Sequence, residues 1–209
     1  MKVIVFGATG TVGKLAVEAM LDAGHHVTAF ARTPARIGLD DPNLSLATGD
    51  ALNEGDVADA LAGHDAVVIT LGSGMSRKSV IRSRGTMNVI RGMQRHGVRR
   101  LICQSTLGAH ESWSNLNFYW KRIMFGALLR PVFKDHELQE QLVRASGLDW
   151  TIVRPAGFTD GVAAGVLHED IAPTERRLSL KIGRREVADF LTRQLTDRRY
   201  SHRAVGISH

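Results

Sequence analysis

A glycine-rich turn lies close to the start of the chain. Gly7, Gly10 and Gly13 follow an apolar stretch at residues 2–6 and open a segment with helical periodicity. A strand that enters a helix through such glycines is typical of a turn that holds a dinucleotide pyrophosphate. The first glycine permits a sharp turn, the second lets the backbone approach the phosphates, and the third lets helix and sheet pack closely. The alternative is a tight strand–helix turn that binds nothing.

A nucleoside-triphosphatase loop does not fit the same residues. That motif has four residues between its first glycine and a Gly-Lys pair, and then Ser or Thr. Here five residues separate Gly7 from Gly13, and Leu15 follows Lys14. Because no hydroxyl is placed to bind magnesium, we do not expect triphosphate hydrolysis.

Length and composition set the broad class. With 209 residues, 44% of them hydrophobic, the chain predicts a single domain, residues 1–209. No apolar stretch is long enough to cross a bilayer and no signal peptide is evident, so we expect a cytoplasmic protein without a membrane partner. The one cysteine, Cys103, excludes an internal disulfide, and its apolar neighbours predict a buried thiol rather than a nucleophile. A monomer is the default expectation.

The net charge of +6 raises the question of a nucleic-acid partner. The basic residues are scattered along the chain, and few aromatic residues lie among them. An anionic cofactor explains the balance equally well. We therefore expect no nucleic-acid partner.

Strand-like and helix-like segments alternate along the whole chain. This alternation predicts an α/β fold of the Rossmann type, a doubly wound, mostly parallel sheet with helices on both faces. The predicted strands are residues 2–6, 26–31, 44–47, 65–70, 100–104, 150–154 and 204–207. The predicted helices are residues 11–23, 56–62, 80–96, 135–146 and 184–195. Two segments are predicted to be substrate-side loops, residues 109–134 and 155–180. The first of them is expected to form a helix or a lid.

Ligands of such sheets bind at the carboxyl ends of the strands. The end of the second strand distinguishes the two nicotinamide cofactors, because an acidic residue there binds the NAD ribose. This chain has no acid there and places Arg32 and Arg36 on either side of a turn. A guanidinium fits a 2′-phosphate, so we predict NADP(H) in preference to NAD(H). The alternative is that both arginines are solvated surface charges.

Asp50 follows the third predicted strand. Its carboxylate fits the adenine amino group. It also fits a turn or the N-cap of the next helix. The sequence leaves both roles open.

Two common active sites are missing. A Tyr-x-x-x-Lys pair is absent, because Ile123 lies four residues after Tyr119 and Ala204 four residues after Tyr200. This absence also argues against sugar epimerisation. His136 begins a His-Glu-x-x-His-like segment, but Glu140 stands where the second histidine would be. We predict no metal site and read the segment as an exposed helix start.

Ser105 is the best polar candidate on the reacting face, because it ends the fifth predicted strand. Its hydroxyl is placed to hold the cofactor carboxamide or a substrate oxygen, but it is no acid of useful pKa. The alternative is a serine that only caps the strand end. A site without a strong acid suits acceptors that take a hydride into a conjugated system, such as flavins, quinones and linear tetrapyrroles.

These motifs together resemble the NmrA-like family of atypical short-chain dehydrogenases/reductases, and within it the NADPH-dependent flavin and biliverdin reductases. The resemblance covers almost the full length. It rests on residues 6–13, 32, 36, 49–50, 62–68, 71–72, 85–90, 96–98, 103–105, 135–136, 146–148, 154–155 and 208–209.

The resemblance implies a role for each group of site residues. The pyrophosphate would be bound by Gly7, Thr9, Gly10, Thr11, Val12 and Gly13. Arg32 and Arg36 would hold the 2′-phosphate, Asp50 and Ala51 the adenine, and Leu71, Gly72 and Ser73 the ribose. The nicotinamide would be bordered by Ser105, Pro155, Ala156, Gly157 and Phe158.

One departure from the family concerns the acceptor. Biliverdin-reducing members carry a histidine two residues after the proline of the sixth strand, where this chain has Gly157. The segment 109–134 is also longer and more aromatic. We therefore expect room beside Gly157 and a flat acceptor held against the aromatic residues of 113–125, with a flavin or quinone favoured over biliverdin.

Two functions follow. The first is an NADPH-dependent oxidoreductase that transfers hydride to a planar conjugated acceptor, a flavin, quinone or tetrapyrrole. The alternative is a non-catalytic NADP(H)-binding redox sensor of the NmrA-like type, which the missing tyrosine–lysine pair favours.

Overall fold

Strands and helices alternate through the computed structural model, which describes residues 1–74, 76, 80–161 and 165–209. The strands are β1 (Lys2–Phe6), β2 (His26–Ala31), β3 (Leu44–Thr48), β4 (Ala66–Ile69), β5 (Arg100–Gln104), β6 (Asp149–Pro155), β7 (Gly157–Thr159), β8 (His168–Glu169), β9 (Lys181–Gly183) and β10 (Arg203–Ser208). The α-helices are α1 (Thr11–Asp22), α2 (Glu54–Leu61), α3 (Ile81–His96), α4 (Arg130–Ala145) and α5 (Arg184–Arg193). Two 3₁₀ helices, η1 (Pro34–Ile37) and η2 (His110–Asn115), and a π-helix, η3 (Tyr119–Leu128), complete the described elements.

The main sheet has the strand order β3-β2-β1-β4-β5-β6-β10-β8. All neighbouring strands are parallel except β8, which pairs antiparallel with β10. The prediction of a mostly parallel, doubly wound sheet is therefore confirmed. The strand order reverses between β1 and β4, and ligands of such sheets bind at the carboxyl side of that point.

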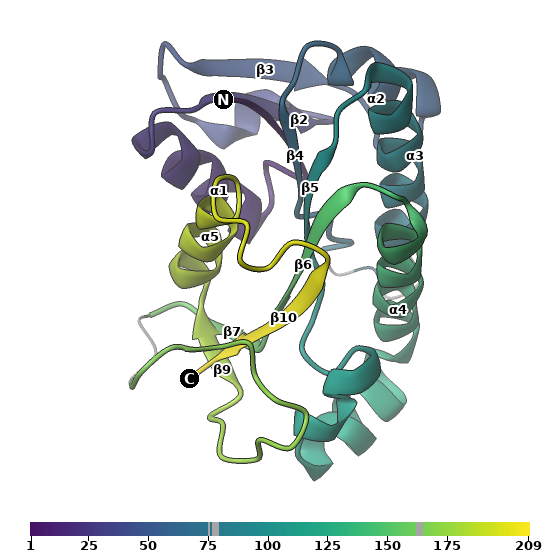
Figure 1. Cartoon of the computed structure of the whole chain (residues 1–209), viewed down its shortest axis with the longest axis vertical. Helices are drawn as coiled ribbons and strands as arrows, with labels where there is room; N and C mark the ends of the chain where they lie inside the picture. Colours follow the sequence, from purple (N-terminus) through teal and green to yellow (C-terminus); the bar gives the residue numbers. More distant parts are fainter. Residues whose placement is uncertain (75, 77–79, 162–164) are drawn as a thin grey trace.

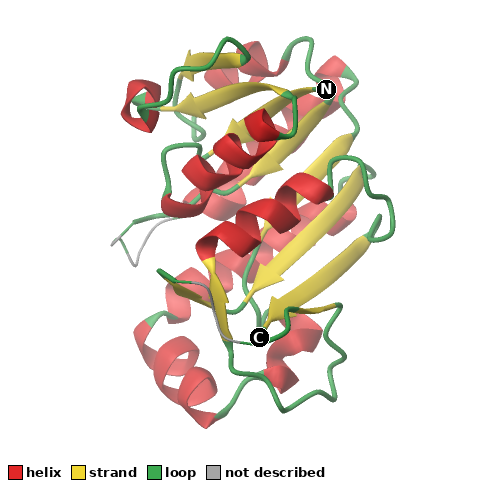
Figure 2. Cartoon of the chain, turned by 90° about the vertical axis from the view of Figure 1, so that its left-hand side faces the viewer, coloured by secondary structure: helices red, strands yellow, loops and turns green. Residues whose placement is uncertain are grey.

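Helices cover both faces of the sheet. Figure 1 shows α1 and α5 on one side and α2, α3 and α4 on the other, and Figure 2 looks onto α1 and α5. The side chains of β1 are divided between the two layers. Val3 and Val5 pack in the cluster that contains α1 and α5, whereas Ile4 and Phe6 pack in the cluster of α2, α3 and α4. This two-sided burial explains the continuous apolar run of β1.

The predicted strands and helices are all present, and most ends differ by one or two residues. The exception is the helix predicted at 135–146, which begins at Arg130. Pro131 lies in its first turn, where no backbone N–H is required, so the proline begins the helix instead of ending it.

The segment 109–134 is largely helical, because it contains η2, η3 and the start of α4. Its aromatic residues divide between core and surface: Phe125 is 7% exposed, whereas Phe118 is 73% exposed. The segment 155–180 was predicted as a loop, but β7 pairs in parallel with β9 and β8 joins the main sheet. Strands this short show no alternation that a sequence could reveal. Residues 162–164 of that predicted loop lie outside the described residues.

Candidate functional site

One cavity of about 940 Å³ runs along the carboxyl ends of the central strands. Every predicted site residue except Gly13 lines it. These residues are Gly7, Thr9, Gly10, Thr11, Val12, Arg32, Arg36, Asp50, Ala51, Leu71, Gly72, Ser73, Ser105, Pro155, Ala156, Gly157 and Phe158.

The glycine turn is shaped by close backbone contacts. Gly7 has φ +90°, and a Cβ there would lie 2.6 Å from the carbonyl oxygen of Thr70. A Cβ on Gly13 would lie 2.1 Å from the carbonyl oxygen of Gly7, so this glycine acts through close packing of helix and turn. The Thr70 hydroxyl donates to the Phe6 and Gly7 carbonyls at 3.2 and 3.3 Å and ties the turn to the end of β4.

The start of α1 is open toward the cavity. Its N-cap, Gly10, makes no side-chain capping hydrogen bond, and the first turn carries no acidic residue. The amide groups of this turn are therefore free to donate to an anion, and the helix dipole favours one.

Arg32, directly after β2, and Arg36, within η1, also line the cavity. Both side chains are exposed to solvent. Their guanidinium groups are available to a phosphate in the cavity.

Asp50 forms the turn after β3. Its Oδ1 accepts a hydrogen bond from the Leu52 amide at 2.9 Å. The N-cap of α2 is Asn53, which accepts from the Gly55 and Asp56 amides, so the N-cap alternative for Asp50 is wrong and the turn alternative is right. Asp50 also lines the cavity.

Several buried polar atoms in the cavity wall have no hydrogen-bond partner within the described residues. They are Ser105 Oγ, Gln104 Oε1, His136 Nδ1 and Arg82 Nε. Leaving a buried polar atom unpaired costs about 1–3 kcal/mol. The wall therefore fits a ligand that offers both donors and acceptors. Ser105 itself is 2% exposed, and its amide donates to the Val153 carbonyl at 2.7 Å, which fixes its position at the end of β5.

The reading of His136–Glu140 as an exposed helix start is wrong. Because α4 begins six residues before His136, this segment lies inside the helix, with His136 9% and Glu140 0% exposed. Burial and the nearby Arg82 guanidinium lower the pKa of His136 to about 3. His136 is therefore a neutral hydrogen-bonding group in the wall of the cavity.

This buried histidine predicts a pH-dependent stability. Between its folded pKa of about 3 and its ordinary value of 6.5, the unfolded chain binds a proton that the folded protein does not. The free energy of unfolding should therefore fall by up to about 1.4 kcal/mol per pH unit as the pH drops through this window. Denaturant titrations at about pH 7 and about pH 5 should show this loss, and His136→Asn should reduce it. An unchanged loss in the variant would assign the acid lability to other groups.

Asp135 caps α3 from a neighbouring helix, an interaction that no local sequence pattern reveals. Its carboxylate accepts from the Arg82 and Ser83 amides, both at 3.1 Å, and from the Ser83 hydroxyl at 2.5 Å. Arg82 in turn donates to the Ser73 hydroxyl at 3.2 Å, so the cap and the cavity wall are connected.

Asp135→Ala should lower the free energy of unfolding by about 1–2 kcal/mol, because the Arg82 and Ser83 amides in the first turn of α3 lose their side-chain acceptor. Chemical denaturation measures this loss. The control is Asp40→Ala, because the Asp40 side chain is exposed. Asp149→Ala is not a suitable control, because Asp149 pairs with buried Arg100. An equal, near-zero effect of the two substitutions would contradict the capping role.

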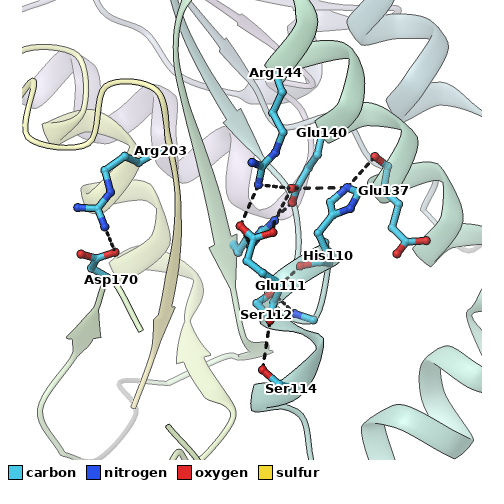
Figure 3. Close-up of polar contacts among 12 residues, drawn as sticks. His110, Glu111, Ser112, Ser114, Glu137, Glu140, Arg144, Asp170 and Arg203 are labelled. Atoms are coloured by element: carbon cyan, nitrogen blue, oxygen red, sulfur yellow. Dashed lines mark hydrogen bonds and ion pairs between the residues drawn. The ribbon is translucent and has the colours of Figure 1, made fainter. Parts of the chain in front are cut away.

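A buried ion-pair network holds the segment after β5. Arg154, at the end of β6, donates two hydrogen bonds to Glu140 at 2.8 and 2.6 Å, and these two side chains are 2% and 0% exposed. Glu111 of η2 joins Arg154 to Arg144, and the His110 ring donates from Nε2 to the Glu137 carbonyl at 3.2 Å (Figure 3). Partial burial raises the pKa of Glu111, but the hydrogen bonds and the positive charge of Arg154 lower it to about 2. The network fixes η2 against α4 beside Pro155 of the cavity wall.

Gly157 does not open the room that its missing side chain predicts. A Cβ at this position would lie 2.8 Å from the Trp120 ring and 3.2 Å from the Leu180 carbonyl oxygen. The indole of Trp120 fills the space, so this expectation is corrected. The wall here is a flat aromatic face.

One end of the cavity contains residues that the sequence motifs did not indicate. It is formed by side chains from η3, its flanks and α4. They are Leu116, Trp120, Phe125, Leu129, Val132 and His136. The four-residue spacing of Val132 and His136 could have indicated these two, had the helix start at Arg130 been recognised.

Other candidate chemistries are not supported by the described residues. Tyr119 is 52% exposed, and Tyr200 is buried with its hydroxyl 3.4 Å from Glu169; burial raises the pKa of Tyr200. Burial also raises the pKa of the Cys103 thiol, as expected for a core cysteine. Within residues 1–74, 76, 80–161 and 165–209 no group of His, Cys, Asp and Glu could hold a metal ion. No helix in these ranges is long and apolar enough to span a membrane.

Fold and cavity together define a dinucleotide-binding protein of the Rossmann class. Residues 7–198 match the model of the NAD(P)H-binding family, and the chain belongs to this family. The matched relatives include NmrA-like atypical short-chain dehydrogenases/reductases, which confirms the resemblance drawn from the sequence.

Three relatives illustrate the family. The chain is 27% identical to the Saccharomyces cerevisiae UPF0659 protein YMR090W, over 93% of this chain and 87% of the relative. It is also 27% identical to the Bacillus subtilis protein named uncharacterized sugar epimerase YhfK, over 100% and 94%. Identity to the photosystem II assembly factor Ycf39 of Synechocystis is 26%, over 78% of this chain and 46% of that protein.

Solved structures confirm the fold. A short-chain dehydrogenase/reductase of Veillonella parvula in complex with NADP matches with a TM-score of 0.83 at 17% identity, over 100% of this chain and 94% of that one. ChuY of Escherichia coli O157:H7, an anaerobillin reductase, matches with a TM-score of 0.77 at 23% identity, over 100% and 97%. At these identities the likeness concerns the fold.

Proposed function

We propose that this protein is an NADPH-dependent reductase that transfers a hydride to a planar conjugated acceptor. The observation that carries the proposal is that one cavity joins an open helix N-terminus and two arginines to a wall of unpartnered polar atoms and an aromatic end. A dinucleotide needs the first two features, and a flat acceptor beside its nicotinamide needs the last two.

Each part of the cavity has one task in this proposal. The amides of the α1 start bind the pyrophosphate, and Arg32 with Arg36 binds the 2′-phosphate, which favours NADP(H) over NAD(H). Asp50 and Ala51 border the adenine, and Leu71, Gly72 and Ser73 border the ribose. Pro155, Ala156, Gly157 and Phe158 lie on the nicotinamide side of the cavity.

The reduced nicotinamide, when bound, supplies a hydride. Ser105 Oγ, buried and unpartnered, orients the carboxamide or an acceptor oxygen by a hydrogen bond. His136 serves as a neutral hydrogen-bonding group and not as the proton donor, because the pKa of about 3 leaves almost no imidazolium at neutral pH. The proton that completes the reduction comes from solvent, which suits flavins, quinones and linear tetrapyrroles.

The test is NADPH oxidation by the purified protein with FMN and a panel of quinones and linear tetrapyrroles, with NADH in parallel. The proposal expects turnover with NADPH and at least one conjugated acceptor, and little with NADH. Sustained failure with every acceptor, despite NADPH binding, would refute it.

Trp120→Ala should weaken the binding of a flat acceptor. The indole faces the cavity next to Gly157, and a stacked aromatic contact contributes roughly two- to tenfold in affinity. We expect the KM for the acceptor to rise by that factor while the KM for NADPH stays within about twofold. Trp113→Ala, whose ring contacts Phe133 and does not line this cavity, is the control. If the KM for NADPH rose and the KM for the acceptor did not, Trp120 would not be part of the acceptor site.

A second candidate function is a non-catalytic NADP(H) sensor. The absence of a strong acid at Ser105 favours this function. One of the matched relatives is also named as an assembly factor and not as an enzyme. The sensor function predicts tight NADPH binding with no oxidation by any acceptor in the panel.

A further inference from the structure

The π-helix η3 carries an exposed apolar face. Phe118, Tyr119, Ile123 and Leu128 are 73, 52, 47 and 42% exposed. The i→i+5 repeat of a π-helix brings residues four or five apart onto one side, so Tyr119, Ile123 and Leu128 lie along one edge. Scattered exposed apolar residues are ordinary, but four within eleven positions form a patch that marks an interaction surface.

A second side of the same helix faces inward. Trp120, Phe125 and Leu129, again five and four residues apart, line the large cavity. The exposed face therefore covers the acceptor end of that cavity. Both views place this segment at the end of the molecule opposite the N-terminus (Figures 1 and 2).

Basic side chains lie on η3 itself and in the first part of α4. Lys121, Arg122, Arg130 and Lys134 line a second hollow of about 630 Å³ between η3 and α4, in which Glu137 is the one acidic lining residue. Arg122, Arg130 and Lys134 are exposed. A partner for this surface must therefore be apolar at its centre and anionic at its edge.

We propose that the exposed face of η3 and the basic residues of η3 and α4 dock the protein on an anionic membrane surface. A helix with aromatic and aliphatic residues on one side and Lys and Arg beside them lies in the plane of such a surface, with its apolar side among the acyl chains and its cations among the headgroups. The expectation of no membrane partner was based on the lack of a segment that could span a bilayer. A helix that lies on the membrane surface does not need such a segment.

Other occupants fit less well. A symmetric contact with a second copy would bring like basic residues together around the apolar centre, because each copy contributes the same patch. A nucleic acid would use the positive charges and the aromatic rings, but Ile123 and Leu128 have no role in stacking on bases. An acidic protein surface remains an outcome that the experiment separates.

The experiment is co-sedimentation of the full-length protein with vesicles, without NADPH or acceptor, so its outcome is independent of the proposed reductase function. Vesicles of phosphatidylcholine alone are compared with vesicles that also contain phosphatidylglycerol, at low and high salt. We expect binding only to the anionic vesicles and weaker binding at high salt.

Two double variants test the surface. Arg122→Glu with Arg130→Glu should weaken partitioning by roughly twentyfold, since each basic residue near an anionic surface contributes about fivefold. Phe118→Ser with Ile123→Ser should weaken it by roughly tenfold or more through lost apolar burial. Thermal melts of these surface variants, with unchanged midpoints, show that the fold is intact.

Matched controls lie on other elements. Arg95→Glu, in the last turn of α3, with Arg99→Glu, just before β5, changes the net charge equally. Leu46→Ser removes an apolar residue that is 51% exposed on β3. Both should bind like the wild type within about twofold to threefold. Equal losses in the charge control would show attraction by net charge alone and overturn the assignment. Absence of binding at low salt would overturn it as well, as would self-association that Phe118→Ser with Ile123→Ser abolishes.

Discussion

Arg154→Ala is expected to lower the free energy of unfolding by about 3–5 kcal/mol. The substitution removes both hydrogen bonds that Glu140 receives from the guanidinium, and Glu140 is 0% exposed, so its charge would remain buried. Glu111 would lose its Arg154 contacts too, but it keeps Arg144 and about half of its side-chain exposure. Most of the loss therefore comes from Glu140. Denaturant unfolding measures it.

Figure 3 also contains the control for this prediction. Arg203 pairs with Asp170 at 2.9 Å, but its side chain is 51% exposed, so Arg203→Ala should cost no more than about 1 kcal/mol. Replacing both buried partners, as in Arg154→Met with Glu140→Leu, should recover much of the stability, because no charge is then left unpaired. If Arg154→Ala cost as little as Arg203→Ala, the buried pair would not hold this part of the fold.

Arg32→Ala with Arg36→Ala is expected to weaken NADPH binding by roughly a hundredfold, since each charge-assisted contact with the 2′-phosphate contributes about tenfold or more. Both side chains are exposed at the rim of the cavity, and solvent screening keeps the estimate at the low end. NADH has no 2′-phosphate, so its affinity should change by less than about threefold. Titration of the variant with both nucleotides measures the two constants.

A matched variant separates this contact from general electrostatics. Arg95→Glu with Arg99→Glu lowers the net charge more, but Arg95 lies in the last turn of α3 and Arg99 just before β5, and neither lines the cavity. It should leave both constants nearly unchanged. Equal affinities for NADPH and NADH in the wild type would contradict the role of Arg32 and Arg36.

Much of the fold could be predicted because local rules and tertiary structure agree. The apolar run of β1 is buried on both faces, Gly7 adopts the positive φ that the turn requires, and Gly97 ends α3 in a left-handed conformation. These features depend on residues close together in the chain. Seventeen of the eighteen predicted site residues, all but Gly13, line one cavity for the same reason, since they follow strands whose ends meet at one edge of the sheet.

The remainder depends on contacts between distant residues. Asp135 caps a helix that begins at Ile81, and Trp120 fills the space beside Gly157. Neither contact has a local pattern. The burial of Glu140 likewise depends on Arg154 of the next strand, so the sequence alone suggested an exposed helix start. A π-helix such as η3 has no distinct apolar period to identify it in advance.

The central claim is that the large cavity holds NADP(H) in one orientation. A crystal structure of the complex with NADP⁺ measures this directly. We expect the 2′-phosphate to contact the guanidinium groups of Arg32 and Arg36. We also expect Ser105 Oγ either to hydrogen-bond the nicotinamide carboxamide or to contact the ring near its C4 atom. A nicotinamide ring bound away from β5 and β6, or a 2′-phosphate that contacts neither arginine, would contradict it.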